Sequence, residues 1–267
     1  MASKMKPSSS LFDLSGKHAL LTGAAGYLGQ AMAHGLASAG CHVILNGRNP
    51  NSLNELKAAI EAEGGKASVL AFDIRDDEAM RQAVSEIEQL DILINNAYAG
   101  GGGTSETATR EEFADAYDVS VSSSAMLTQQ CLPLLRRNPG TSTSSVIYLS
   151  SMYGQVSPDL SVYANKAGAN PPFYGAAKAA LLQLTRYQAS ELGGSGIRVN
   201  ALCPGPFPSS EVQTKMPDFV DTLGAKTPLG RIGQAPELAG PVVFLASDAS
   251  SYMTGSVLTI DGGWTSL

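Results

Sequence analysis

Short apolar runs alternate along the chain with longer segments in which apolar residues recur at helical spacing. Each short run is almost continuously apolar, as is typical of parallel strands covered on both faces. The runs expected to form strands are His18–Thr22, His42–Asn46, Ser68–Phe72, Ile92–Asn95, Val146–Ser150, Ile197–Cys203 and Ser256–Ile260. The segments expected to form helices are Leu28–Ala39, Asn51–Glu63, Asp76–Gln89, Arg110–Arg136, Tyr174–Leu192 and Pro236–Ala246. This alternation predicts an α/β protein with a Rossmann fold, in which helices flank a doubly wound, seven-stranded parallel sheet.

Two stretches, 155–173 and 204–230, interrupt the alternation, but neither has the composition of a linker between two cores. We therefore expect a single domain over residues 11–267. Residues 1–10 are polar and lack the apolar centre of a secretory signal, which predicts a disordered tail.

With 43% hydrophobic and 16% charged residues, the composition excludes a mainly disordered protein. The formal net charge of −6 disfavours a nucleic acid or an anionic membrane as a partner. No apolar run approaches the roughly 18 residues that a membrane span requires. The cysteines Cys41, Cys131 and Cys203 lie far apart, and the histidines lack metal-ligand spacing. Free thiols, no metal centre and a cytoplasmic location are therefore expected.

A glycine-rich turn, Thr22–Gly29, follows the first predicted strand and leads directly into a helix. Small residues there let the backbone approach a pyrophosphate, and the helix N-terminus supplies free N–H groups. The position between a strand and a helix favours a nucleotide-binding turn. A tight turn with only a structural role is the alternative.

The end of the second predicted strand favours one cofactor over another. Proteins that bind NAD usually place a carboxylate there to hold the ribose hydroxyls. Here the strand ends in Asn46-Gly47-Arg48-Asn49, and the next acid is Glu55, inside the following helix. Because the guanidinium of Arg48 could pair with a 2′-phosphate, NADP(H) is favoured and NAD(H) is the alternative. A solvated surface arginine is the simpler interpretation of Arg48.

Candidate chemistry follows the fifth predicted strand. Ser150 and Ser151 stand at the end of that strand, and Tyr174 and Lys178 follow on a predicted helix. Residues four apart lie on the same helix face, so this tyrosine and lysine can act together. The alternative is a core helix whose tyrosine and lysine merely extend their polar ends to water.

Several motifs stand at strand ends in a characteristic order. They are the turn at 22–29, Asp73-Ile74, Asn95-Asn96-Ala97, Ser151, Tyr174-x-x-x-Lys178, Pro204-Gly205 and the tail Phe244–Trp264 with Asp261-Gly262-Gly263. In these motifs the chain resembles the short-chain dehydrogenase/reductase family over nearly its whole length. The resemblance implies an oxidoreductase that acts on CH–OH groups and transfers hydride between a nicotinamide and a ketone or secondary alcohol.

The resemblance also implies roles for the candidate residues. Tyr174 would be the general acid in reduction and the general base in oxidation. A free phenol has a pKa of about 10, and positive charge from Lys178 would favour the phenolate. Ser151 would donate a hydrogen bond to the carbonyl oxygen. The residues expected to bind the cofactor are Gly23, Ala25, Tyr27, Leu28, Arg48, Asn49, Asp73, Ile74, Asn96, Ala97, Tyr98, Tyr174, Lys178, Pro204, Gly205 and Phe207.

The sequence departs from the family pattern at three places. Tyr27 occupies the usual middle-glycine position of the turn. Ser120 stands where the family has an asparagine that kinks a helix and completes a proton relay, so we predict a modified relay in which Ser120 is catalytic. The stretch between Ser151 and Tyr174 is longer than is common, and the extra residues fall at about 158–172. This insertion is either a surface or subunit-contact loop or a polar substrate lid.

The family keeps its mobile substrate loop where this chain has residues 204–230. The polar side chains of the loop and of the insertion favour a hydroxylated substrate, such as a keto-sugar or sugar acid of the gluconate 5-dehydrogenase kind. Reduction of 3-oxoacyl thioesters is the alternative within the enzyme class, and a non-catalytic NADP(H)-binding sensor or scaffold is the alternative outside it. The family commonly forms tetramers, and the apolar face of Ala176–Leu184 suggests a homotetramer.

Overall fold

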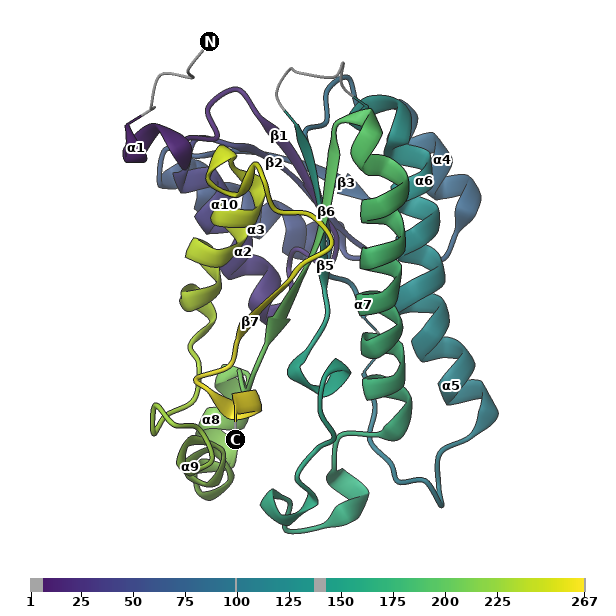
Figure 1. Cartoon of the computed structure of the whole chain (residues 1–267), viewed down its shortest axis with the longest axis vertical. Helices are drawn as coiled ribbons and strands as arrows, with labels where there is room; N and C mark the ends of the chain where they lie inside the picture. The colour runs from purple at the N-terminus through teal and green to yellow at the C-terminus, as the bar shows by residue number, and fades with distance from the viewer. Residues whose placement is uncertain (1–6, 99, 137–142, 267) are drawn as a thin grey trace.

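The computed structural model describes residues 7–98, 100–136 and 143–266. All strands that the sequence predicts are present, and they form one sheet (Figure 1). The strands run parallel in the order β3-β2-β1-β4-β5-β6-β7. Their bounds are β1 His18–Leu21, β2 His42–Gly47, β3 Lys66–Ala71, β4 Ile92–Asn95, β5 Ser144–Leu149, β6 Ile197–Pro204 and β7 Val257–Ile260. The chain winds outward in one direction from β1 and in the other from β4, so the expected doubly wound sheet is confirmed.

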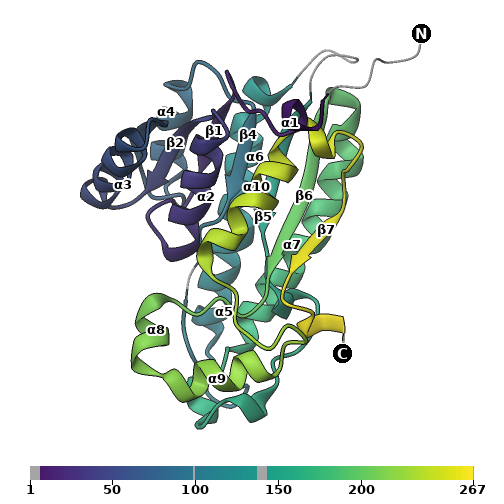
Figure 2. The ribbon, with the colours of Figure 1, turned by 90° about the vertical axis from the view of Figure 1, so that its left-hand side faces the viewer.

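Helices cover both faces of the sheet (Figures 1 and 2). One face carries α2 (Tyr27–Ser38), α3 (Pro50–Ala62) and α10 (Ala239–Ala246), and the other carries α4 (Asp77–Ser85), α5 (Arg110–Tyr117), α6 (Ser123–Leu135) and α7 (Pro172–Leu192). Successive side chains of a strand point to opposite faces of the sheet and so pack against different helix layers. Leu21 belongs to the apolar core on the α2 side and Leu20 to the core on the α7 side, and both are fully buried. Within the described ranges, no helix is both long and apolar enough to cross a bilayer.

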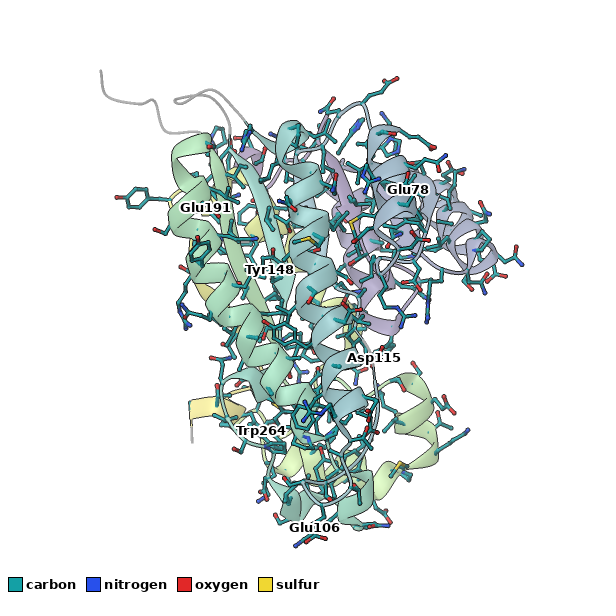
Figure 3. The ribbon with its side chains drawn as sticks, turned by 90° about the vertical axis from the view of Figure 1, so that its right-hand side faces the viewer. Glu78, Glu106, Asp115, Tyr148, Glu191 and Trp264 are labelled. Atoms are coloured by element: carbon teal, nitrogen blue, oxygen red, sulfur yellow. The ribbon has the colours of Figure 1, made fainter. Side chains whose placement is uncertain are left out.

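Side-chain hydrogen bonds join α6 and α7 to the sheet, and the two helices lie side by side over it (Figure 3). Tyr148 of β5 is buried between them. Its hydroxyl donates to Gln188 on α7 at 2.6 Å and lies 2.9 Å from the Thr128 hydroxyl on α6. The position of α7 relative to the strand end at Ser151 is therefore fixed by a buried polar contact as well as by apolar packing.

One long predicted helix is interrupted. The sequence predicts a continuous helix over Arg110–Arg136, but α5 and α6 are separated by a π-helical turn, η1 (Asp118–Ser122). Ser120 is at the centre of this turn. Such turns insert one extra residue and are frequent at functional sites. The helix is therefore distorted at this position although the residue is a serine and not the asparagine that the family has there.

The irregular stretches contain short elements. Between residues 204 and 230 lie α8 (Ser210–Lys215), which Ser209 caps, and α9 (Pro217–Ala225), which begins at a proline. The insertion contains the 3₁₀ turns η3 (Leu160–Val162) and η4 (Lys166–Gly168). These elements lie beyond the carboxyl ends of the strands (Figure 2).

The N-terminal tail differs in part from the prediction. A short helix, α1 (Ser8–Leu11), begins inside the segment 1–10 that was expected to be disordered, whereas residues 1–6 of that segment lie outside the described residues. The ring of Phe12, which follows this helix, lies 6.4 Å from the ring of Phe244 on α10. This contact accounts for order where the polar composition predicted none.

Candidate active site

A cavity of about 1180 Å³ lies along the carboxyl ends of the strands, at the point where β1 and β4 lead in opposite directions. This is where doubly wound sheets bind their ligands. The cavity receives residues from the glycine-rich turn and from the ends of β2 to β6. Its walls contain every predicted cofactor residue together with Ser151: Gly23, Ala25, Tyr27, Leu28, Arg48, Asn49, Asp73, Ile74, Asn96, Ala97, Tyr98, Tyr174, Lys178, Pro204, Gly205 and Phe207.

Other residues line the same cavity that were not named individually as cofactor or catalytic residues, although Gly26 and Gly29 belong to the predicted turn and Ser150 to the predicted strand end. They are Gly26, Gly29, Asn46, Gly47, Ser52, Leu53, Phe72, Arg75, Gly100, Asp115, Val119, Leu149, Ser150, Ser209 and Val212. Arg75 could have been found from its position two residues after Asp73. No sequence signal marks Asp115, because the fold alone brings α5 to the end of β3.

The glycine-rich turn needs glycine at two positions. Gly23 has a φ of +61°, and a Cβ there would lie 3.0 Å from the side-chain nitrogen of Asn96. A Cβ on Gly29 would lie 2.3 Å from the Gly23 carbonyl oxygen. Tyr27 meets no such constraint, because no non-glycine residue in the described chain has a positive φ. The tyrosine in the middle-glycine position therefore leaves the turn unstrained.

Buried hydrogen bonds fix the turn to the neighbouring strand. The Thr22 hydroxyl accepts from the backbone N–H groups of Asn96, at 2.9 Å, and Ala97, at 3.1 Å. The Asn96 side-chain amide donates to the carbonyl oxygens of Thr22 and Gly23 at 2.9 and 3.1 Å. Asn96 thus joins the residues that follow β1 to those that follow β4, and it lines the cavity at this point.

The first turn of α2 fits the phosphates of a dinucleotide. In the described chain, no side chain caps this helix and its first turn holds no acidic residue. By contrast, Asn49 caps α3 and Thr109 caps α5. The uncapped N–H groups and the positive end of the helix dipole at α2 are suited to an anionic group. The residues present therefore fit a dinucleotide cofactor.

Charged side chains gather at the ends of β2 and β3. Arg75 pairs with Asp73 at 3.1 Å and with Asp115 at 3.3 Å. The hydrogen bond from the Arg75 side chain, together with further contacts, lowers the pKa of the Asp73 carboxyl. Arg48 lines the same end of the cavity and makes no ion pair within 4.0 Å among the described residues. Asn49, expected to bind the cofactor, also accepts from the Asn51 N–H at 2.9 Å.

Ser151, Tyr174 and Lys178 meet at the other end of the cavity. The Lys178 ammonium donates to the Leu149 carbonyl oxygen at 2.7 Å, and the Ser150 hydroxyl donates to the Lys178 carbonyl oxygen at 2.7 Å. The Lys178 nitrogen lies 5.6 Å from the ring centre of Tyr174. The strand end and the helix are thus tied together at the lysine, which is almost fully buried.

Burial sets the protonation states of this group. It raises the pKa of Tyr174 to about 12, against a hydrogen bond with Ser151 that lowers it. Burial also lowers the pKa of Lys178 to about 8. At neutral pH the phenol is therefore protonated and the ammonium is charged. Tyr174 is in the form required to give a proton to a ketone oxygen.

Ser120 occupies a different position from the other candidates. Its π-helical turn packs against α7, and the side chain is buried. The neighbouring Val119 lines the cavity, but Ser120 is not among the lining residues. A catalytic role for Ser120 stays a prediction.

The insertion packs against the substrate loop. Val162 is buried in an apolar cluster with Leu223 and Ile232. Asp159 forms an ion pair with Lys226 at 2.8 Å, just past the end of α9. The two interpretations of the insertion are a surface or subunit-contact loop and a polar substrate lid. These contacts with the substrate loop support the lid, which stays a prediction.

A Rossmann fold in which the uncapped α2 follows a glycine-rich turn, and in which a partly buried tyrosine and a buried lysine line the same cavity, is suited to nicotinamide-dependent oxidoreduction. A family model described as "Enoyl-(Acyl carrier protein) reductase" matches residues 23–265. The chain belongs to the short-chain dehydrogenase/reductase family. It is therefore an enzyme of the class that acts on CH–OH groups, and the predicted fold, family and enzyme class are confirmed.

Individual relatives cover nearly the whole chain. Gluconate 5-dehydrogenase of Gluconobacter oxydans is 36% identical, over 96% of this chain and 97% of its own. A rhamnolipids biosynthesis 3-oxoacyl-[acyl-carrier-protein] reductase of Pseudomonas aeruginosa is 35% identical, over 95% and 98%. Among solved structures, a gluconate 5-dehydrogenase from Burkholderia cenocepacia in complex with NADP and tartrate superimposes with a TM-score of 0.85, at 28% identity over 98% of this chain and 100% of its own.

Proposed function

We propose that the protein interconverts the ketone and the secondary alcohol of a polar, sugar-acid type substrate, with NADP(H) as the preferred cofactor. The observation that carries the proposal is the meeting of Ser151, Tyr174 and Lys178 in one cavity with the glycine-rich turn. The similarity to gluconate 5-dehydrogenases supports the sugar-acid class.

The side chains of the cavity perform the proton chemistry. When bound, the nicotinamide supplies the hydride that reduces the ketone. The hydroxyls of Ser151 and Tyr174 donate hydrogen bonds to the carbonyl oxygen and stabilise the negative charge that develops on it. Tyr174 transfers its proton to that oxygen, which completes the alcohol. The Lys178 ammonium then stabilises the remaining phenolate, and Ser120 is proposed to hold a water through which Tyr174 takes up a new proton from solvent.

The substrate preference can be tested with the wild-type enzyme. Initial rates of NADPH oxidation are measured with 5-ketogluconate, simple ketoses, β-keto thioesters and aromatic ketones. We expect the highest kcat/KM with the keto sugar acid. The 3-oxoacyl thioester alternative, which the Pseudomonas aeruginosa relative supports, predicts the β-keto thioester instead. A preference for an aromatic ketone would contradict both.

The cofactor preference is assigned to Arg48. Its guanidinium lies at the end of β2 and has no ion pair among the described residues, which leaves it available to a 2′-phosphate. In Arg48→Ala, the loss of a charge-assisted hydrogen bond should raise the KM for NADPH roughly ten- to a hundredfold and leave that for NADH unchanged. Arg81→Ala, which removes an exposed arginine on α4, is the control. Equal changes for both cofactors would refute the assignment.

The proposal extends to location and assembly. The three cysteines are free and buried, in keeping with a reducing cytoplasm. Exposed apolar side chains on α5, α6 and α7, namely Phe113, Tyr117, Met126 and Tyr187, support a homotetramer built on these helices.

A further inference from the structure

Two tyrosines from separate segments meet beside the proposed catalytic serine. Tyr153 follows Ser151 by two residues, and its backbone N–H donates to the Ser151 hydroxyl oxygen at 3.2 Å. The hydroxyl of Tyr153 lies 3.5 Å from that of Tyr163, which belongs to the insertion. The insertion therefore brings a second phenol to Tyr153, beside the cavity that Ser151 lines, although neither tyrosine is among the residues lining that cavity.

The substrate loop holds Tyr163 in place. Its ring centre lies 5.4 Å from that of Phe219 on α9. Its neighbour Val162 is buried against Leu223 of the same helix. The ion pair between Asp159 and Lys226 joins the two segments a second time. Tyr163 is thus held by contacts of its own segment with α9 and with Lys226 just past it, which limits the rotamer entropy it would lose on binding a ligand.

The contact between the two hydroxyls is long. An O–H···O hydrogen bond usually measures about 2.7–2.8 Å, so a separation of 3.5 Å leaves both oxygens with capacity for a stronger partner. Burial, followed by the contact with Tyr163, raises the pKa of Tyr153 far above neutrality. Its phenol therefore stays neutral and can both donate and accept. A hydroxyl group of a ligand can also both donate and accept, so it could hydrogen-bond to both phenols.

We propose that Tyr153 and Tyr163 form a subsite that binds a hydroxyl of the substrate next to the reacting carbonyl. This inference rests on the proposed function and names the substrate feature that the site recognises: a polyhydroxylated ketone rather than a bare one. A substrate without the hydroxyl leaves a partly buried phenol pair without its partner, which is how sites of this kind reject deoxy analogues.

The test compares two ketones with the same carbon skeleton. Both 5-ketogluconate and 5-oxohexanoate have six carbons, a C5 carbonyl and a carboxylate, and only the first has hydroxyls. In Tyr153→Phe and Tyr163→Phe, we expect kcat/KM for 5-ketogluconate to fall about three- to tenfold through KM, since one neutral hydrogen bond is lost. The value for 5-oxohexanoate should not change. Tyr252→Phe, at a fully exposed position, is the control.

Each other outcome has a distinct meaning. An equal loss for both ketones would assign the tyrosines a structural role and overturn the subsite, as would no loss for either. A wild-type preference for 5-oxohexanoate would also overturn it. If the wild type reduces neither ketone, the proposed function itself fails, and the inference fails with it. Thermal unfolding of each variant separates these results from misfolding.

Discussion

At the scale of single residues, burial decides what Tyr174 and Lys178 can do. The same loss of solvent that raises the pKa of the phenol to about 12 lowers that of the ammonium to about 8. The acid therefore keeps its proton at neutral pH, while the lysine loses its charge above about pH 8. Opposite shifts in neighbouring groups are a mark of functional sites.

These shifts predict different pH profiles for the two directions of the reaction. Reduction needs the protonated phenol and the charged lysine, so its kcat/KM should be level below about pH 8 and fall above it. Oxidation needs Tyr174 without its proton, so its rate should rise with pH from neutrality upward. Initial rates in both directions between pH 6 and 10 measure this. Parallel profiles would contradict the assignment of Tyr174 as acid and base.

At the scale of elements, the insertion packs against α9. Val162→Asp places a carboxylate in their shared apolar cluster and should detach them. We expect kcat/KM for the ketone to fall roughly tenfold, because we propose that these elements close over the substrate, while NADPH affinity is unchanged. Val156→Asp, at an exposed position in the same stretch, is the control. Equal kinetics of the two variants would show that these elements do not cover the substrate.

The elements also differ in how far the sequence predicts them. The strands were predicted because burial on both faces makes them continuously apolar. The π-helical turn at Asp118–Ser122 was missed, since one extra residue hardly disturbs a helical pattern that continues on both sides. The helices α8 and α9 were missed because short helices depend on tertiary contacts more than on local preference.

The residues of the candidate site also divide into those that sequence motifs predict and those that only tertiary packing places. Motif residues such as Gly23 and Tyr174 sit at strand ends and helix starts, where their order along the chain fixes their place. Asp115 reaches the cavity because the fold brings α5 to the end of β3, and Tyr163 is held near Tyr153 by packing against Phe219 of α9. A pattern along one chain carries no signal for contacts of that kind.

At the scale of the whole molecule, one cavity brings the candidate cofactor-binding residues and the candidate catalytic residues together. One end holds the uncapped start of α2 and the Arg48 side chain, and the other holds Ser151, Tyr174 and Lys178. The sheet places them at one edge because all its strands run in the same direction (Figure 1). The loop elements α8 and α9 lie over this edge (Figure 2).

The central claim is that Tyr174 supplies the proton in a cofactor-dependent ketone reduction. The most direct measurement compares NADPH oxidation by the wild type and by Tyr174→Phe on the best ketone, with NADPH binding followed by fluorescence. We predict that kcat falls roughly 10²- to 10⁴-fold, as expected for the loss of a general acid, while NADPH binds as before. Undiminished turnover by Tyr174→Phe, with cofactor binding intact, would contradict this mechanism.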